Sequence, residues 1–205
     1  MYAAFGVTIV SLKWIDPITT SVQIERRYEA WRAHQPYRKR YAFVPMNRIS
    51  HDLRHAVVAA EDTRFSEHSG IDWIEVQKVL EQDMERGKLG RGGSTISQQL
   101  VKNLFLTTNR SLLRKGLEFT LVPMVEIVLG KERILELYLN VIEWGPGVYG
   151  AEAASRYWYN IPASQVGREQ AARLASVIPN PRRRKPDRMD AYTGIILTRM
   201  KQMGW

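Results

Sequence analysis

A carboxylate at the end of a predicted helix is the first candidate for chemistry. The segment Asp52–Ala60 predicts a helix, because apolar side chains recur at i, i+4 and i+7 at Leu53, Val57 and Ala60. Glu61 then lies at the edge of the apolar face, and Asp62 is expected to point away from it. Partial desolvation raises the pKa of a carboxyl group, which suits a general acid or base. The alternative is a helix-end carboxylate that sits in water.

A polar stripe on a second predicted helix is the next candidate. Thr95 and Gln98 have capping-box spacing, so a helix is expected to begin there. Gln99, Lys102 and Asn103 follow at i, i+3 and i+4 and therefore share one face. Two amides and one cation beside an apolar stripe are suited to donate hydrogen bonds to a sugar or a phosphate.

A third group carries positive charge. Arg110, Arg114 and Glu118 recur at i, i+4 and i+8, with Lys115 alongside. This spacing places the three side chains along one side of a helix. It also fits an ordinary intrahelical salt bridge between Arg114 and Glu118, worth only about 0.3–0.5 kcal/mol.

The elements that position these residues are predicted to be helices. Pro123 should kink the helix that starts near Ser111, because proline removes a backbone hydrogen bond. Gly87–Gly93 is expected to form a mobile loop in the wall of the site. Gly145–Gly150 matches G-x-G-x-x-G, but no strand precedes it, so we expect a tight turn between helices and no dinucleotide site.

Further helices are expected at 23–34, 71–84, 131–140, 151–159, 168–177 and 192–203. With no convincing run of strands, the chain is expected to be one mainly α domain.

Composition narrows the class of partner. The chain has 205 residues, a net charge of +9 and a pI near 9.9, which favour an anionic partner such as nucleic acid, lipid headgroups or a phosphate-bearing substrate. It has no cysteine, so disulfides and thiolate metal sites are excluded.

The N-terminal segment Met1–Trp14 is largely apolar. At ~1.5 Å per residue a helix of this length spans roughly 21 Å, short of the ~30 Å hydrocarbon core. We interpret it as the outer end of a membrane anchor, the alternative being an N-terminal core helix. The basic cluster Arg38-Lys39-Arg40 between Tyr37 and Tyr41 is either a solvated loop or a contact for anionic lipid headgroups.

Five sequence blocks, read in order, resemble one known family. They are Glu61-Asp62-x-x-Phe65-x-x-His68-x-Gly70, then Gly93-Ser94-Thr95-Ile96-x-Gln98-Gln99-Leu100-x-Lys102-Asn103-Leu104-Phe105, Arg114-Lys115-x-x-Glu118, Lys131-x-x-Ile134-Leu135-Glu136-x-Tyr138-Leu139-Asn140 with Gly145 and Tyr149-Gly150, and Arg173-Leu174 with Pro179-Asn180-Pro181. Across roughly Ile49–Pro181 the chain resembles the peptidoglycan glycosyltransferases of glycosyltransferase family 51. It contains no Ser-x-x-Lys, Ser-Asp-Asn or Lys-Thr-Gly, so it resembles the monofunctional biosynthetic form, without a transpeptidase.

The resemblance implies a fold, a reaction and a location. The expected fold is a lysozyme-like helical glycosyltransferase domain over 25–205, with a small membrane-embedded jaw at roughly 71–115, preceded by anchor and linker at 1–24. The expected reaction is polymerisation of lipid II: the growing chain on undecaprenyl pyrophosphate is the donor, the 4-hydroxyl of the lipid II GlcNAc is the acceptor, and the anomeric centre inverts. The expected location is the bacterial inner membrane, single-pass, with a periplasmic catalytic domain.

The resemblance also assigns roles to residues. Glu61 matches the catalytic base, and Glu118 matches the second catalytic carboxylate and is the candidate ligand of a divalent metal, Mg²⁺ or Mn²⁺; no organic cofactor is expected. The expected substrate-binding residues are Asp62, Phe65, His68, Ser94, Thr95, Gln98, Gln99, Lys102, Asn103, Arg110, Arg114 and Lys115. Moenomycin is the expected inhibitor, cell-wall or division proteins are candidate partners, and nucleic acid is not a partner.

Two other classes of protein compete with this reading. A lysozyme or lytic transglycosylase also uses a glutamate in a helical fold, but it needs no cationic pyrophosphate site of the kind predicted between Lys102 and Lys115. A basic nucleic-acid-binding or membrane-scaffold protein explains the net charge but leaves the Glu61 and Gln98-Gln99 blocks without a purpose.

Overall fold

The computed structural model describes residues 2–86, 93–109 and 111–205. Two predictions therefore concern positions outside the described residues: the role of Arg110 and nearly all of the glycine-rich loop at 87–93. Within the described part the fold is mainly helical, as predicted.

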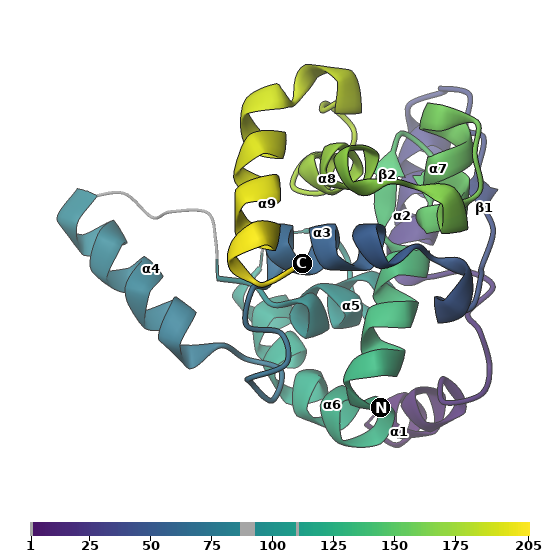
Figure 1. The fold of residues 1–205 in the computed structure, drawn as a ribbon. Coiled ribbons are helices and arrows are strands. Elements are labelled where there is room, and N and C mark those ends of the chain that lie inside the picture. Colours follow the sequence, from purple (N-terminus) through teal and green to yellow (C-terminus); the bar gives the residue numbers. More distant parts are fainter. Residues whose placement is uncertain (1, 87–92, 110) are drawn as a thin grey trace.

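Helix α3 (His51–Glu61) runs through the middle of the molecule, with α8 (Arg168–Val177) and α9 (Asp190–Gln202) on one side (Figure 1). It begins where predicted, because the Ser50 hydroxyl accepts a hydrogen bond from the backbone N–H of Leu53 and caps the first turn. Its apolar side chains are buried from Leu53 to Ala60. This packing fixes the position of Glu61 at the end of the helix.

Helices α5 (Ile96–Phe105) and α6 (Leu112–Val141) pack against each other and form the layer below α3 in Figure 1. The predicted capping box starts α5, with Thr95 and Gln98 exchanging side-chain and backbone hydrogen bonds. Inside α6 the residue that leaves helical φ/ψ is Gly130, at φ +70°, so the predicted helices starting near 111 and 131 are separated there. The kink was expected at Pro123, but Pro123 keeps helical dihedrals and is exposed.

A small sheet corrects the expectation that no strand precedes the glycine turn at 145–150. Its order is β1 (Arg40–Tyr41), β3 (Val148–Tyr149), β2 (Glu143–Gly145), with β1 parallel and β2 antiparallel to β3. The strands are only two or three residues long, too short for an alternating pattern to be recognised. The predicted glycine turn is therefore a β-hairpin: Gly147 has φ +70°, and a Cβ there would lie 2.5 Å from the carbonyl oxygen of Arg38.

The N-terminal helices cover the lower and rear parts of the molecule (Figure 1). In α1 (Tyr2–Ser11), Ile9 is buried on α6, whereas Val7 and Val10 are exposed. One face of α1 thus belongs to the hydrophobic core, and the opposite face is exposed. None of the described helices combines the length and apolar character needed to cross a bilayer. Helix α2 (Ser21–Arg32) packs against α5.

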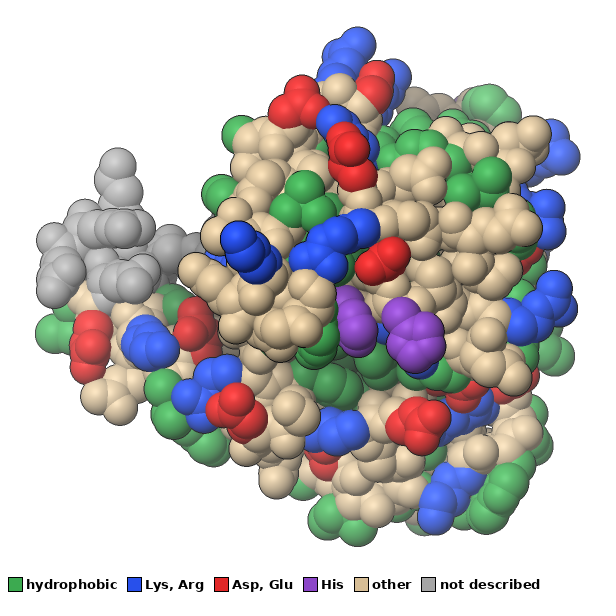
Figure 2. Space-filling model, in the orientation of Figure 1, with side chains coloured by type: hydrophobic (Ala, Val, Ile, Leu, Met, Phe, Trp, Pro, Cys, Tyr) green, Lys and Arg blue, Asp and Glu red, His purple; other side chains and the backbone are tan. Residues whose placement is uncertain are grey.

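Helix α4 (Trp73–Arg86) projects from the body like an arm (Figure 1). The predicted amphipathic pattern is present, but its apolar side is not buried: Ile74, Leu80 and Met84 are 47%, 54% and 83% exposed. Figure 2 shows hydrophobic side chains at the surface of this arm.

The remaining elements of the described residues are α7 (Ala151–Tyr159) and three short 3₁₀ helices, η1 (Met46–Arg48), η2 (Ala163–Gln165) and η3 (Pro186–Arg188).

Candidate active site

A cavity of about 490 Å³ brings most of the predicted site residues together. Its walls come from α2, α5, the first turns of α6, β2 and the segment that follows α8. The predicted residues in its lining are Ser94, Gln98, Gln99, Lys102, Asn103, Arg114, Lys115 and Glu118. The fifth sequence block joins them through Pro179, Asn180 and Pro181.

Glu61 reaches this cavity through one of its lining residues. The Gln99 amide nitrogen donates to Glu61 Oε2 at 2.7 Å, and the Gln99 amide oxygen accepts from the Tyr138 hydroxyl at 2.9 Å. Tyr138 is fully buried, so its hydroxyl fixes which end of the amide faces the carboxylate. Gln99 therefore orients Glu61 and links it to the cavity.

The electrostatics around Glu61 fit a proton acceptor. Burial raises the pKa of Glu61 above its ordinary value, and the hydrogen bond from Gln99 and the charges of Lys102 and Arg184 oppose that rise. Burial lowers the pKa of Lys102, because it disfavours the charged ammonium group, and the negative charges of Glu118 and Glu61 oppose that change. The predicted rise at Glu61 is thus present, and its main cause is desolvation.

Glu118 is buried at the cavity wall and is held by two cations from its own helix. Arg114 Nη1 contacts Glu118 Oε2 at 2.6 Å, and Lys115 Nζ contacts Oε1. The salt bridge that the spacing allowed is therefore present, and it also lies inside the cavity. The carboxylate holds two positive side chains side by side where an anionic ligand would enter.

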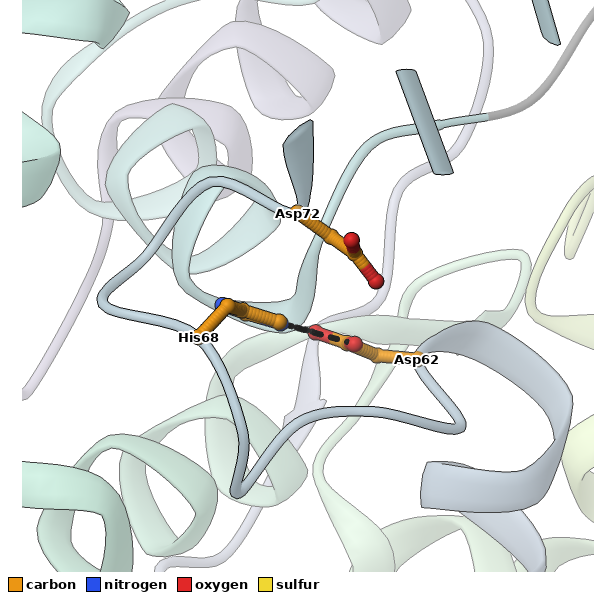
Figure 3. Close-up of side chains that lie close together, drawn as sticks. All are labelled: Asp62, His68 and Asp72. Carbon is orange, nitrogen blue, oxygen red and sulfur yellow. Dashed lines mark hydrogen bonds and ion pairs between the residues drawn. The ribbon is translucent and has the colours of Figure 1, made fainter. Parts of the chain in front are cut away.

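The buried side chains of Asp62 and His68 form a pair (Figure 3). The Gly70 N–H donates to His68 Nδ1, so His68 Nε2 carries the proton and donates to Asp62 at 2.9 Å. Asp62 also accepts from the Ile96 N–H at 3.0 Å and so ties α3 to the start of α5. Asp62 was expected to point away from the apolar face. It turns inward because it lies at the C-cap with φ −162°, where the helical projection no longer applies.

Two other residues that were predicted to bind substrate, Phe65 and Thr95, also make contacts within the protein. Phe65 is buried under the ammonium group of Lys131, 4.5 Å from its ring centroid. The Thr95 hydroxyl donates to the carbonyl of Gly70. Asp62, Phe65, His68 and Thr95 are not among the described residues that line the cavity.

Asp62, His68 and Asp72 are a candidate metal-binding group, with one ligand atom from each within 4.8 Å of the others (Figure 3). Their donor atoms already have partners, however. Asp72 caps α4 through the N–H groups of residues 74 and 75, and Arg64 Nε lies 3.3 Å from its other oxygen. A metal ion would have to displace that guanidinium and the hydrogen bonds of the other two, so the arrangement fits a hydrogen-bonded support better than a resident metal.

Sequence reasoning missed an ion pair in the cavity wall. Arg26 Nε from α2 lies 3.2 Å from Glu143 Oε2 in β2, and Glu143 is buried. The partners are 117 residues apart, so no local spacing reveals them. The other lining residues that were missed are Val22, Thr108, Ile142, Ile178 and Arg182.

Comparison with known proteins identifies the family. The family model described as Transglycosylase matches residues 28–201. The chain belongs to this family. It is 51% identical over 165 residues to the biosynthetic peptidoglycan transglycosylase of Janthinobacterium sp. (strain Marseille), covering 78% of this chain and 71% of that protein. It is 47% identical over 191 residues to the protein of the same name from Dechloromonas aromatica (strain RCB), covering 91% and 83%.

These matches confirm the resemblance drawn from the five blocks, and with it the class of a glycosyltransferase of peptidoglycan synthesis. In this transglycosylase the residues that line the cavity lie within the matched range, except for Val22 and Arg26 of α2.

Proposed function

We propose that the protein polymerises lipid II into glycan strands, with Glu61 as the general base. The acceptor 4-hydroxyl attacks the anomeric carbon of the donor chain, and the bond from that carbon to undecaprenyl pyrophosphate breaks with inversion. The proton of the hydroxyl passes to Glu61 as the new glycosidic bond forms, and the bonding electrons leave with the pyrophosphate.

The half-buried, desolvated setting of Glu61 supports its role as the base. Its raised pKa makes the carboxylate a better proton acceptor near neutral pH than an exposed glutamate. The hydrogen bond from Gln99 holds it at the cavity edge without neutralising it.

The cationic wall supports the leaving-group role. Lys102, Arg114 and Lys115 line one cavity, and a pyrophosphate gains negative charge as its bond to the sugar breaks. The observation that carries the proposal is this single cavity, in which three cations converge next to the amide that holds Glu61. A glycan-cleaving enzyme releases no such anion.

A divalent metal is not built into the proposed reaction. Both Glu118 oxygens face cations, so the carboxylate as it stands does not fit the predicted role of metal ligand. Bound Mg²⁺ or Mn²⁺ would neutralise pyrophosphate charge; here Lys102, Arg114 and Lys115 provide that neutralisation. Glu118 keeps the last two in place.

The proposal includes a membrane setting. Lipid II is a membrane lipid, so the exposed apolar side of α4 and the exposed residues of α1 are proposed to contact the bilayer, as the jaw and the end of the anchor. The proposed location is the periplasmic face of the bacterial inner membrane, where cell-wall or division proteins are candidate partners.

Incubation of the purified protein with lipid II tests the function. Wild type should produce glycan polymer, and Glu61→Gln should lose at least about 10²-fold in turnover, because glutamine keeps the shape but cannot accept the proton. Binding of lipid II by Glu61→Gln should be largely kept. Near wild-type turnover by this variant would refute the assignment of the base, and absence of polymer with wild type would refute the proposed function.

A further inference from the structure

The end of α3 is held from outside the cavity by helix α9. The carbonyls of Ala59 and Ala60 belong to the last turn of α3, where backbone oxygens lack partners within the helix. Arg199 Nη1 donates to the Ala59 oxygen at 3.2 Å and lies 3.5 Å from the Ala60 oxygen. A cation is favourable at this position, because it meets the negative end of the helix dipole.

Tyr192 adds a second contact from the same helix. Its hydroxyl lies 3.4 Å from the Ala60 oxygen, one residue before Glu61. The negative charge of Glu61 is among the causes that raise the pKa of Tyr192, after burial, so the phenol lies within the electric field of that carboxylate.

Arg184 connects this group to α8. Its guanidinium lies 5.4 Å from the centroid of the Tyr192 ring and donates to the carbonyl of Ser176 at 2.9 Å. Arg184, Tyr192 and Arg199 are not among the described residues that line the cavity. Tyr192 and Arg199 instead contact the end of the helix that carries Glu61.

We propose that Arg184, Tyr192 and Arg199 form a positioning group for Glu61, which fixes the last turn of α3. The positive charge of Arg184 also acts on the Glu61 carboxylate. The inference rests on the proposed role of Glu61 and adds residues C-terminal to the five sequence blocks. It assigns α9 a part in the reaction although the helix does not reach the cavity.

The charged and titratable groups around Glu61 set the expected sign. Asp62 on α3 raises the pKa of Glu61, while Lys102 on α5 and Arg184 lower it; Tyr138 on α6 and Tyr192 on α9 are the phenols beside it. Loss of Arg184 removes one of these two cations. The pKa of Glu61 should then rise further, and the acid limb of the activity profile should move to higher pH.

The first test compares Arg184→Gln with Arg183→Gln, which removes the same charge from the adjacent exposed position. In Arg184→Gln the acid limb of lipid II turnover should shift up by about half to one pH unit, a loss of about three- to tenfold at a fixed pH on that limb. Turnover at the alkaline plateau should stay within about twofold. Overlapping profiles for the two variants would overturn the inference.

The second test addresses geometry through Arg199. Arg199→Met should lower turnover by about ten- to a hundredfold, the scale of loss when a reacting group is displaced by about 1 Å. Arg199→Lys should recover most of it, whereas Lys201→Met, an exposed control on the same helix, should match wild type. Tyr192→Phe, which keeps the ring and loses the hydroxyl, should give a smaller loss. Turnover is normalised to the folded fraction from circular dichroism. Failure of lysine to rescue Arg199→Met would leave only a structural role and overturn the inference.

A measurement without substrate separates this inference from the proposed function. Titration of the ¹³C-labelled Glu61 carboxyl by NMR should give a higher pKa in Arg184→Gln than in wild type or Arg183→Gln. An unchanged pKa overturns the inference even if wild type polymerises lipid II. A raised pKa supports the electrostatic part even if polymerisation fails, and that failure then counts against the proposed function alone.

Discussion

At the scale of single residues, the burial of Glu61 has a consequence for stability as well as for catalysis. A carboxyl group whose pKa is raised in the folded state contributes most stability at low pH, and this contribution is lost as pH rises through the folded-state pKa. Glu61→Gln removes that dependence. We therefore expect the variant to be more stable than wild type at pH 8, with the difference vanishing near pH 4. Thermal unfolding across this pH range is the measurement, and a difference that grows toward acid pH would contradict the sign.

The charge of Glu118 can be removed by the same kind of substitution, glutamate to glutamine. Glu118→Gln removes the charge that holds Arg114 and Lys115, so both cations should separate and bind pyrophosphate less well. Turnover should fall by about tenfold or more, as for loss of a charge-assisted contact at a reacting group.

Turnover as a function of Mg²⁺ and Mn²⁺ concentration distinguishes two roles for Glu118. An unchanged metal dependence with lower turnover supports the holding of cations. A changed metal dependence supports the metal-ligand role expected from the sequence.

Lys102 provides a test with an inhibitor. Moenomycin is a phosphoglycolipid, and its phosphate should need the same cations as the donor pyrophosphate. Lys102→Ala and Arg110→Ala should each weaken moenomycin binding by about tenfold, the value of one charge-assisted hydrogen bond. Lys201→Ala, an exposed position on α9, is the matched control. Undiminished affinity in both folded variants would place the phosphate site elsewhere.

At the scale of elements, α4 exposes the apolar side chains of Leu80 and Met84. Leu80 and Met84 should enter the bilayer, where burial of one such side chain is worth about 1.5–3 kcal/mol. Leu80→Ser with Met84→Ser should therefore weaken co-sedimentation with lipid vesicles by at least about tenfold without lowering the melting temperature. Gln77→Ser on the same exposed helix is the control. Equal vesicle binding by the double variant and the control would remove α4 from the membrane contact.

At the scale of the whole molecule, the net charge of +9 predicts a salt-dependent attraction to anionic membranes. Binding to vesicles with anionic lipid should fall as salt is raised, because surface attraction is screened within about 8–10 Å at physiological salt. Binding to neutral vesicles should change little. Equal binding to both vesicle types at every salt concentration would leave only the apolar contribution.

The sequence by itself determined the features that depend on near neighbours in the chain. The period of Leu53, Val57 and Ala60 predicted α3, and the pair Thr95 and Gln98 predicted the start of α5, because helix faces and caps involve residues three or four positions apart. The salt bridge between Arg114 and Glu118 was predictable for the same reason. The five blocks, read in order, were sufficient to predict the family that the comparisons show.

The tertiary structure alone decided the contacts between distant segments. Asp62 bonds to Ile96, Tyr138 orients Gln99, and Arg26 pairs with Glu143. These partners lie 34, 39 and 117 residues apart in the sequence. The position of the break in α6 also depended on context: Pro123 lost a hydrogen bond but stayed helical, whereas Gly130 took the positive φ that costs a glycine little. Periodicity predicts which side of a helix is apolar. Only the arrangement of the other elements decides whether that side is buried, as in α3, or exposed, as in α4.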